Sequence, residues 1–291
     1  MGWRIVVVTK PSKLDLKLGY LVVRDSESSV RIHLSEISIL IVETTRSSIT
    51  TALLNELVRQ KIKTIFCDEK QNPSSELLPC NGSYNCSAKI REQIKWQDHT
   101  KQLVWTCIVA EKIRKQAENL RYFEKSESEK LYRYLDELEF NDASNREGHA
   151  AKVYFNALFG KSFSRSEECP VNAALNYGYS IVLSCVNREV ACNGYITQLG
   201  LFHDNMFNPF NLSCDLMEPF RPIVDGFVKK SAFSIFETAE KQAVLSLLNR
   251  EFVVSERKET LINAIKLYVR SVFNALETGD TSCIKTYRYE L

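Results

Sequence analysis

Three polar side chains in the second half of the chain have the chemistry of a metal site. Glu147, His203 and Glu218 stand in separate stretches and supply two carboxylates and one imidazole. Mg²⁺ usually binds one or two carboxylates together with substrate phosphates, and an imidazole ligand shifts the preference toward Mn²⁺. Such a site suits phosphoryl transfer on a nucleic acid, because the metal neutralises phosphate charge and orients the attacking oxygen. We expect all three side chains at the surface of a cleft.

The first of these residues also has a purely structural interpretation. Glu147 follows Ser144 by three residues, which is the spacing of a capping box at the start of a helix. Gly148, directly after it, is unusual inside a helix, where glycine costs about 1 kcal/mol relative to alanine. A residue without a side chain suits the close approach of a backbone or a ligand. Both interpretations of Glu147 stay open at this point.

The other two residues have structural alternatives as well. His203 follows a helix-like stretch, residues 192–199, and a local interaction near the end of that helix could satisfy its ring. Asp215 or Glu218 could cap a helix that begins at the nearby prolines. Taken one at a time, these residues therefore do not establish a metal site.

A second motif, Gly160-Lys161-Ser162, ends like a phosphate-binding P-loop. The residue five positions before Gly160 is Phe155, where that loop needs glycine, and the preceding segment is helical rather than a strand. We therefore expect a helix that ends at Gly160 and no hydrolysis of nucleotides.

The charge of the chain is nearly balanced, with 38 Lys and Arg against 36 Asp and Glu in 291 residues. This balance excludes a histone-like polycation but leaves room for a local basic groove. The polar stretch 95–102, with Trp96, could lie along a DNA duplex. Basic side chains also flank the proposed site, and we expect some of them to neutralise DNA phosphates: Arg146, Lys152, Lys161, Arg165, Arg221, Lys229 and Lys230.

The first seventy residues follow a period of two, which is typical of strands with one buried face. A short helix capped by Ser48 interrupts them. The expected features are alternating strands over 13–18 and 30–34, a hairpin turn over 25–28, a central strand over 37–42 and a further strand over 63–67.

The apolar period changes to 3.6 in the remainder, after a stretch rich in Asn, Pro, Ser and Gly. This period predicts helices over residues 90–117, 131–138, 239–247 and 261–276. The predicted fold class is α+β: a small N-terminal β-sandwich domain over 1–70, a linker over 71–87, and a larger all-α catalytic domain over 88–291.

Nothing in the sequence predicts export or membrane insertion. The apolar run at the start is too short for a signal peptide and ends at Lys10-Pro11. No stretch approaches the roughly 18 apolar residues that a membrane-spanning helix needs. The nine cysteines contain no C-x-x-C pair, which argues against a structural zinc site. We expect a cytoplasmic protein with reduced thiols.

Four motifs stand in a fixed order in the second half of the chain. They are Glu147-Gly148 with Ala151 and Tyr154-Phe155, Asn172 with Asn176-Tyr177-Gly178-Tyr179, Gly200 with His203, and the run Asp215-Leu216-Met217-Glu218-Pro219-Phe220-Arg221-Pro222. In this order and spacing they resemble the CRISPR-associated spacer-acquisition endonuclease and integrase family. The resemblance covers the whole chain. Its compact length, and Glu218 where many relatives carry Asp, resemble the type II-A branch.

The resemblance implies a metal-dependent DNA endonuclease and integrase of adaptive antiviral immunity. It assigns metal binding and catalysis to Glu147, His203 and Glu218, with Mg²⁺ or Mn²⁺ as the cofactor. The 3′-hydroxyl of a captured DNA fragment would attack a phosphodiester at the repeat boundary of a CRISPR array. One phosphodiester replaces another in that reaction, so no nucleotide is hydrolysed.

The same resemblance implies partners. Double-stranded DNA would bind as the captured fragment and as the CRISPR repeat. The family forms homodimers through the β domain, and two dimers bracket a dimer of the small second CRISPR-associated protein. The effector nuclease and a DNA-end-binding protein also associate in this branch, and no membrane is involved. Two other functions stay open: a nuclease of branched or repair DNA that does not integrate, and a non-catalytic DNA-binding scaffold whose Glu147 and Glu218 only cap helices.

Overall fold

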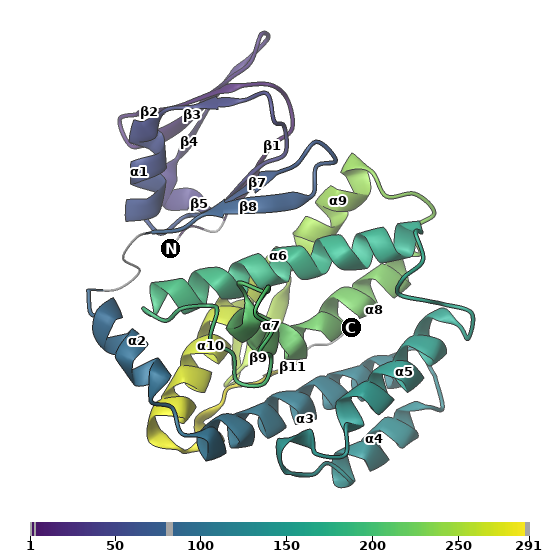
Figure 1. Cartoon of the computed structure of the whole chain (residues 1–291). Helices are drawn as coiled ribbons and strands as arrows, with labels where there is room; N and C mark the ends of the chain where they lie inside the picture. Colours follow the sequence, from purple (N-terminus) through teal and green to yellow (C-terminus); the bar gives the residue numbers. More distant parts are fainter. Residues whose placement is uncertain (1, 3, 80–83, 289–291) are drawn as a thin grey trace. The chain divides into compact units, whose positions relative to one another are not determined.

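The computed structural model describes residue 2 and residues 4–79 and 84–288, and the chain divides into two compact units (Figure 1). Unit 1 runs from Met1 to Tyr84 and unit 2 from Asn85 to Leu291. The N-terminal part is built of strands and the second part mainly of helices, which confirms the predicted fold class in outline. Among the described residues, no helix is both long enough and apolar enough to cross a membrane.

Unit 1 contains two four-stranded sheets that share one apolar core. The first sheet has the order β1 (Arg4–Val8), β5 (Ile37–Val42), β7 (Lys63–Cys67), β8 (Pro73–Leu77). The second has the order β4 (Ser29–His33), β3 (Tyr20–Arg24), β2 (Lys13–Lys17), β6 (Ser48–Ile49). A short helix, α1 (Thr51–Arg59), packs Leu53 and Leu57 into the core between them.

The strand predictions for unit 1 hold in most details. Strand β5 is buried along its whole length and lies between β1 and β7, as a central strand should. The turn between β3 and β4 is held by Asp25, whose Oδ1 accepts the backbone N–H groups of Glu27 (2.8 Å) and Ser28 (2.6 Å). The predicted helix cap at Ser48 is wrong, because Ser48 pairs with β2 in strand β6 and Thr50 is the N-cap of α1.

The segment predicted as a linker, residues 71–87, contains structure at both ends. Its first part forms β8, which pairs antiparallel with β7, and its last residues begin α2. Proline and serine made this segment look like a loop, but β8 is an edge strand, where proline is tolerated.

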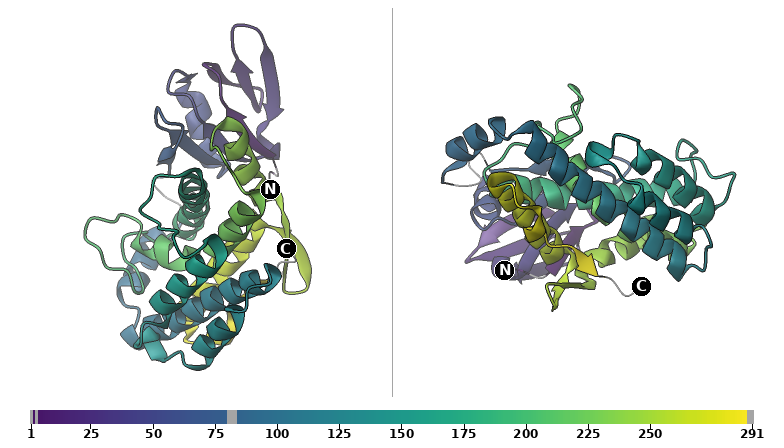
Figure 2. Two further views of the ribbon diagram at one scale, coloured as in Figure 1. Left: turned by 90° about the vertical axis from the view of Figure 1, so that its right-hand side faces the viewer. Right: turned by 90° about the horizontal axis from the view of Figure 1, so that it is seen from below.

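Unit 2 is built around one long helix, α3 (Asp98–Tyr122), which contacts α4, α5, α8 and α10 (Figures 1 and 2). The other helices are α2 (Cys86–Ile94), α4 (Ser128–Asp136), α5 (Arg146–Phe159), α6 (Pro170–Cys192), α7 (Asn211–Met217), α8 (Arg221–Ser231), α9 (Thr238–Leu245) and α10 (Leu261–Thr278). The unit is not all-α, since β9 (Glu251–Val254), β10 (Arg257–Thr260) and β11 (Tyr287–Arg288) form a small sheet in the order β10-β9-β11. Short 3₁₀ turns join several helices.

Two helix predictions in unit 2 are wrong. The expected helix over 90–117 is two helices, α2 and α3, broken at residues 95–97. Trp96, which we expected to face a DNA duplex, is only 9% exposed and packs against Tyr195 and Phe273. The expected helix over 192–199 is absent, because α6 ends at Cys192 and Gly194 then adopts φ +87°.

Candidate active site

Glu147 lies in the first turn of α5, and other residues cap that turn. Asn145 is the N-cap, and its Oδ1 accepts the backbone N–H of Gly148 at 3.3 Å. The carboxylate of Asp142 accepts the N–H groups of Arg146 (2.6 Å) and Glu147 (3.1 Å). The capping box from Ser144 is therefore wrong, and the carboxylate of Glu147 is not needed to start the helix.

The cap also explains the glycine beside Glu147. A Cβ atom at position 148 would lie 2.7 Å from Oδ1 of Asn145 and 3.0 Å from its Nδ2. Gly148 thus makes room for the capping side chain of Asn145. The backbone of Asn145 is itself in the left-handed conformation, with φ +52°. The side chain of Asn145 thus makes the close approach for which Gly148 leaves room.

Glu218 occupies a buried turn between two helices. It opens a 3₁₀ turn, Glu218–Phe220, that joins α7 to α8. The residue is 5% exposed, so the expectation of a surface carboxylate is wrong. Its Oε1 accepts a hydrogen bond from Nε of Arg221 at 2.8 Å, and its Oε2 lies 2.5 Å from Nζ of Lys112. Burial alone would raise the pKa of Glu218, but the charges of Lys112 and Arg221 outweigh it and hold the pKa below its ordinary value.

Lys112 joins the two predicted acidic ligands. It lies in the middle of α3, with 9% of its side chain exposed, and its ammonium forms ion pairs with both Glu147 and Glu218. Burial would lower the pKa of Lys112, but the charges of Glu218 and Glu147 raise it. Two carboxylates from α5 and from the α7–α8 turn thus converge on one cation held by α3.

His203 is oriented by an acidic residue from the next helix. Its Nδ1 lies 2.5 Å from Oδ1 of Asp215, which is fully buried in α7. The carboxylate of Asp215 also accepts the backbone N–H groups of residues 201, 202 and 203 at 2.6, 3.1 and 3.2 Å. The hydrogen bond to Asp215, together with the charges of Asp215 and Glu218, raises the pKa of His203. With Nδ1 held by Asp215, Nε2 is the ring nitrogen that remains for chemistry.

An aromatic residue of α3 supports the loop that carries His203. The ring of Trp105 stacks on Phe202 with centroids 4.6 Å apart and planes 3° apart, and meets His203 edge to face at 6.0 Å. Trp105 and Lys112 are two helical turns apart and therefore lie on one face of α3. This face contacts both halves of the candidate site.

The structure thus brings the three predicted residues to one neighbourhood and adds three that the sequence analysis did not select: Lys112, Asp215 as the partner of His203, and Trp105. Asp215 lies inside a motif that was visible, and its spacing from Glu218 was the available signal. Lys112 and Trp105 belong to a long mixed helix in which no spacing sets them apart.

The donor set suits a divalent metal in its chemistry. Two carboxylates share one ammonium, so both already face a positive charge, and an imidazole with one free nitrogen lies in their electric field. As arranged, no three His, Cys, Asp or Glu side chains among residues 4–79 and 84–288 form a ready metal site. A metal held by Glu147 and Glu218 would have to compete with the ammonium of Lys112 for their carboxylates.

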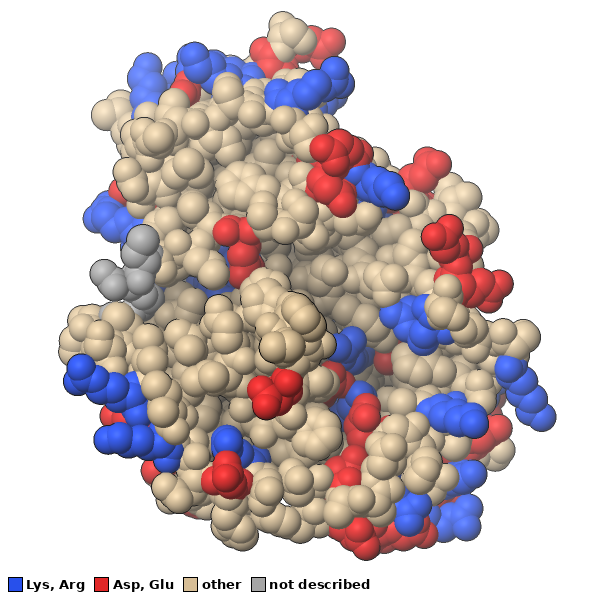
Figure 3. Space-filling model, in the orientation of Figure 1, with Lys and Arg blue, Asp and Glu red and all other residues tan. Residues whose placement is uncertain are grey.

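The basic residues predicted to bind DNA lie in three different settings. Arg165 and Arg221 both stack on Tyr179, at 5.5 and 4.8 Å from its ring, so Arg165 belongs to the surroundings of the site. Figure 3 shows basic and acidic side chains close together in a hollow of the face that it draws. Arg146 pairs with Glu137 at 3.0 Å. The four lysines lie apart from these: Lys152 is exposed on α5, Lys161 is exposed in the turn after α5, Lys229 lies beside Phe159 and Lys230 is bonded to Tyr122.

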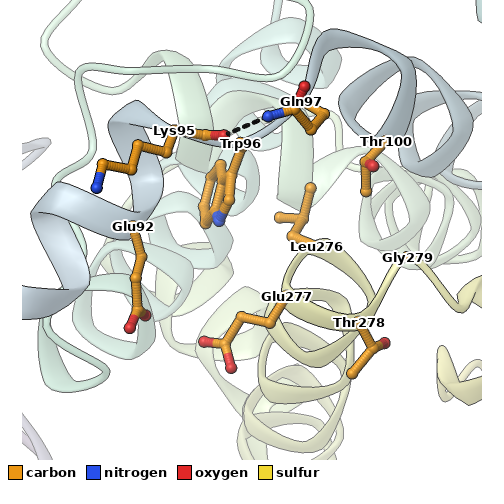
Figure 4. A pocket seen from close by; sticks show the side chains of 9 residues that line it. All are labelled: Glu92, Lys95, Trp96, Gln97, Thr100, Leu276, Glu277, Thr278 and Gly279. Atoms are coloured by element: carbon orange, nitrogen blue, oxygen red, sulfur yellow. Dashed lines mark hydrogen bonds between the residues drawn. The ribbon is translucent and has the colours of Figure 1, made fainter.

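A separate cavity of about 510 Å³ lies where α2 ends and α3 begins, against the end of α10 (Figure 4). Trp96 and Leu276 line it together with polar side chains, among them Glu92 and Glu277. Nε2 of Gln97 donates to the carbonyl of Lys95 at 3.3 Å across its rim. None of the predicted site residues lines this cavity, so it is distinct from the candidate site.

The chain as a whole is similar to a known protein family. A family described as "CRISPR associated protein Cas1" matches residues 5–256. The chain is 35% identical, over 227 residues, to "CRISPR-associated endonuclease Cas1" of Neisseria meningitidis serogroup C, with 77% of this chain and 74% of that protein covered.

Two solved structures share the fold at low sequence identity. A casposase bound to its integration product has a TM-score of 0.77 at 16% identity, covering 96% of this chain and 92% of the casposase. A Cas6-RT-Cas1–Cas2 complex has a TM-score of 0.75 at 15% identity, covering 99% of this chain and 36% of the matched chain. At these identities the likeness concerns the fold alone.

Proposed function

Since the chain belongs to the CRISPR-associated Cas1 family of endonucleases and integrases, we propose that it is a metal-dependent integrase that inserts captured DNA fragments into a CRISPR array. The observation that carries this proposal is the convergence of Glu147 and Glu218 on Lys112, beside an imidazole that Asp215 orients. A structural capping role accounts for neither carboxylate, because Asn145 and Asp142 cap α5 and Glu218 binds two cations.

Glu147, His203 and Glu218 would hold the metal, which when bound neutralises charge on the scissile phosphate. Asp215 fixes the ring of His203 so that Nε2 is presented in one orientation. Arg221 is anchored by Glu218 and carries further N–H donors whose geometry suits phosphate oxygens. The ammonium of Lys112, which pairs with both carboxylates in this structure, would have to move aside for the metal.

The proposed reaction conserves the number of phosphodiester bonds. The 3′-hydroxyl of the captured fragment loses its proton as its oxygen forms a bond to phosphorus at the repeat boundary, the bond to the departing 3′-oxygen breaks, and that oxygen takes up a proton. No nucleotide hydrolysis is required. The Gly160 segment agrees with this, since Gly160 ends α5 at φ +108° as predicted and no strand precedes it.

We further propose DNA and a Cas2-type protein as partners, and a homodimer formed through unit 1. The fold that this chain shares with a casposase bound to its integration product and with a Cas1–Cas2 complex supports the first two. The dimer rests on the family resemblance alone.

The test is strand transfer of a short duplex into a repeat-bearing plasmid, with Mg²⁺, Mn²⁺ or EDTA. Glu147→Gln, His203→Ala and Glu218→Gln should each abolish transfer, because each removes a ligand, and circular dichroism should show that they fold. Glu251→Gln changes an exposed carboxylate of β9 and is the matched control. Cutting without joining would favour a plain nuclease. Transfer that survives EDTA, or that survives two of the three substitutions, would refute the metal site.

A further inference from the structure

The loop that carries His203 also exposes two large apolar side chains. It connects α6 to α7, and Figure 2 shows it, green in both views, standing out from the helices around it. Met206 is 88% exposed and Phe207 is 87% exposed. Two adjacent large apolar side chains that are this exposed do not gain the free energy of burial. Such an exposed apolar pair indicates a surface that binds a partner.

The tip of this loop is held in place by asparagine side chains. Asn211 donates from Nδ2 to the carbonyls of Gln198 (3.1 Å) and Asn205 (3.0 Å). Asn205 accepts the backbone N–H of Phe207 at its Oδ1 at 2.9 Å, and Asn208 accepts that of Phe210 at 3.0 Å. These turns fix the backbone on both sides of Met206 and Phe207, so the two side chains are presented by a preorganised support.

The base of the loop is tied to the candidate site. Asp215 binds the backbone of residues 201–203, and Phe202 stacks on Trp105 of α3. Phe207 follows His203 by four residues, so their Cα atoms are separated by at most about 14 Å. Successive phosphates of one stacked strand advance by about 3.4 Å along the helix axis. A strand with one phosphate at His203 therefore brings bases only a few nucleotides away within reach of Phe207.

We propose that Met206 and Phe207 form a stacking surface for an unpaired base of the DNA strand that enters the site. The inference rests on the proposed function and adds a binding element to it. An aromatic face binds any base by stacking, and the polarizable thioether of methionine packs well beside it. Among the described residues Phe207 stacks on no other ring, so its faces remain for a base. Paired bases inside a duplex offer no such face, which makes the surface selective for unpaired ends.

The test compares two DNA fragments in metal-free buffer, so that binding is measured apart from reaction. One is a blunt duplex and the other carries short unpaired 3′ ends, each labelled for fluorescence anisotropy. Phe207→Ala should weaken binding of the unpaired-end fragment about 5- to 150-fold, the range expected for loss of one base–aromatic stack, and affect the blunt duplex much less. Phe207→Trp keeps an aromatic face and should retain the wild-type preference for the unpaired-end fragment. Ile235→Ala, which removes an apolar side chain that is 54% exposed elsewhere in unit 2, should change neither affinity.

Equal loss on both fragments, or no loss on either, would overturn the proposal. A change of oligomeric state in Phe207→Ala, measured by light scattering, would also overturn it and identify the loop as a protein interface. The integrase proposal is judged separately by strand transfer, which can succeed or fail whatever Phe207 binds.

Discussion

Replacing Lys112 with methionine should destabilise the metal-free protein and make it more responsive to metal. The ammonium of Lys112 is the shared partner of Glu147 and of the buried Glu218. Removing one partner of a buried ion pair typically costs about 3–5 kcal/mol, because the remaining charge is left without compensation. Arg221 still contacts Glu218 at 2.8 Å, so we expect the lower end of that range.

This loss can be expressed as a melting temperature. For a unit of this size, 1 kcal/mol corresponds to roughly 2–4 °C, so the variant should melt about 6–12 °C below the wild type in EDTA. Metal that binds only the folded state at a hundred times its Kd adds about 2.7 kcal/mol. In the wild type the metal must displace the ammonium of Lys112, which reduces the stabilisation that binding provides. In Lys112→Met no ammonium competes with the metal for the carboxylates. Mn²⁺ should therefore raise the melting temperature of the variant more than that of the wild type.

The assay is thermal unfolding with EDTA and with a series of Mn²⁺ concentrations, followed by a direct titration of Mn²⁺ binding. Lys152→Met makes the same substitution at an exposed position of α5 and should shift neither quantity. If Lys112→Met is as stable as the wild type without metal, the ion pairs of Lys112 do not stabilise the folded protein. If Mn²⁺ stabilises both proteins equally, Lys112 and the metal do not compete, and the reasoning fails.

Three further predictions follow from the same region. Glu218→Asp should transfer strands more slowly than the wild type but clearly better than Glu218→Ala, with Mn²⁺ rescuing it better than Mg²⁺, because the shorter stem misplaces the carboxylate by roughly 1 Å; equal inactivity in both metals would contradict this. Burial raises the pKa of Asp225 to about 6, so its folded state binds a proton that the unfolded chain releases near 3.8, and stability should fall as pH rises from about 4 to about 6; Asp225→Asn should flatten this part of a denaturation profile measured against pH, and an unchanged slope would argue against it. DNA binding should survive EDTA and fall steeply with added salt, since phosphate neutralisation supplies most of the affinity; salt-independent binding would refute that.

Much of the fold was predictable because its signals are local. The alternation in β2, the apolar run of β5 and the acidic turn at Asp25 depend on neighbouring residues, and the structure has them where the pattern predicts. The break at residues 95–97 was missed because Trp96 packs on Tyr195 and Phe273, which are distant in the sequence. The sheet of β9, β10 and β11 was missed for a related reason, since β11 joins it from the far end of the chain.

The candidate site was also predictable only in part, since its residues could be selected from the sequence but their surroundings could not. Glu147, His203 and Glu218 lie in compact motifs and could be selected by residue type and order. Their environment could not, because the burial of Glu218 depends on how α3 packs against α7 and α8. The capping box from Ser144 was wrong because the true cap, Asn145, cannot be recognised until its left-handed backbone is known.

Helix α3 shows why apolar periodicity in the sequence does not predict which charged residues are buried. Its buried side chains include Glu111, Lys112, Lys115, Gln116 and Asn119, so the helix lacks a continuous apolar stripe although it lies at the centre of its unit. A polar helix face normally indicates solvent. Here Asn119 binds Tyr154 and the carbonyl of Pro222, while Lys112 binds the two candidate ligands, so partners from other helices satisfy these groups. Buried charge is costly unless it is paired, and α3 places its charges where the carboxylates of the site need a cation. The polarity that hid the burial of this helix in the sequence is thus the property that fits it to the site.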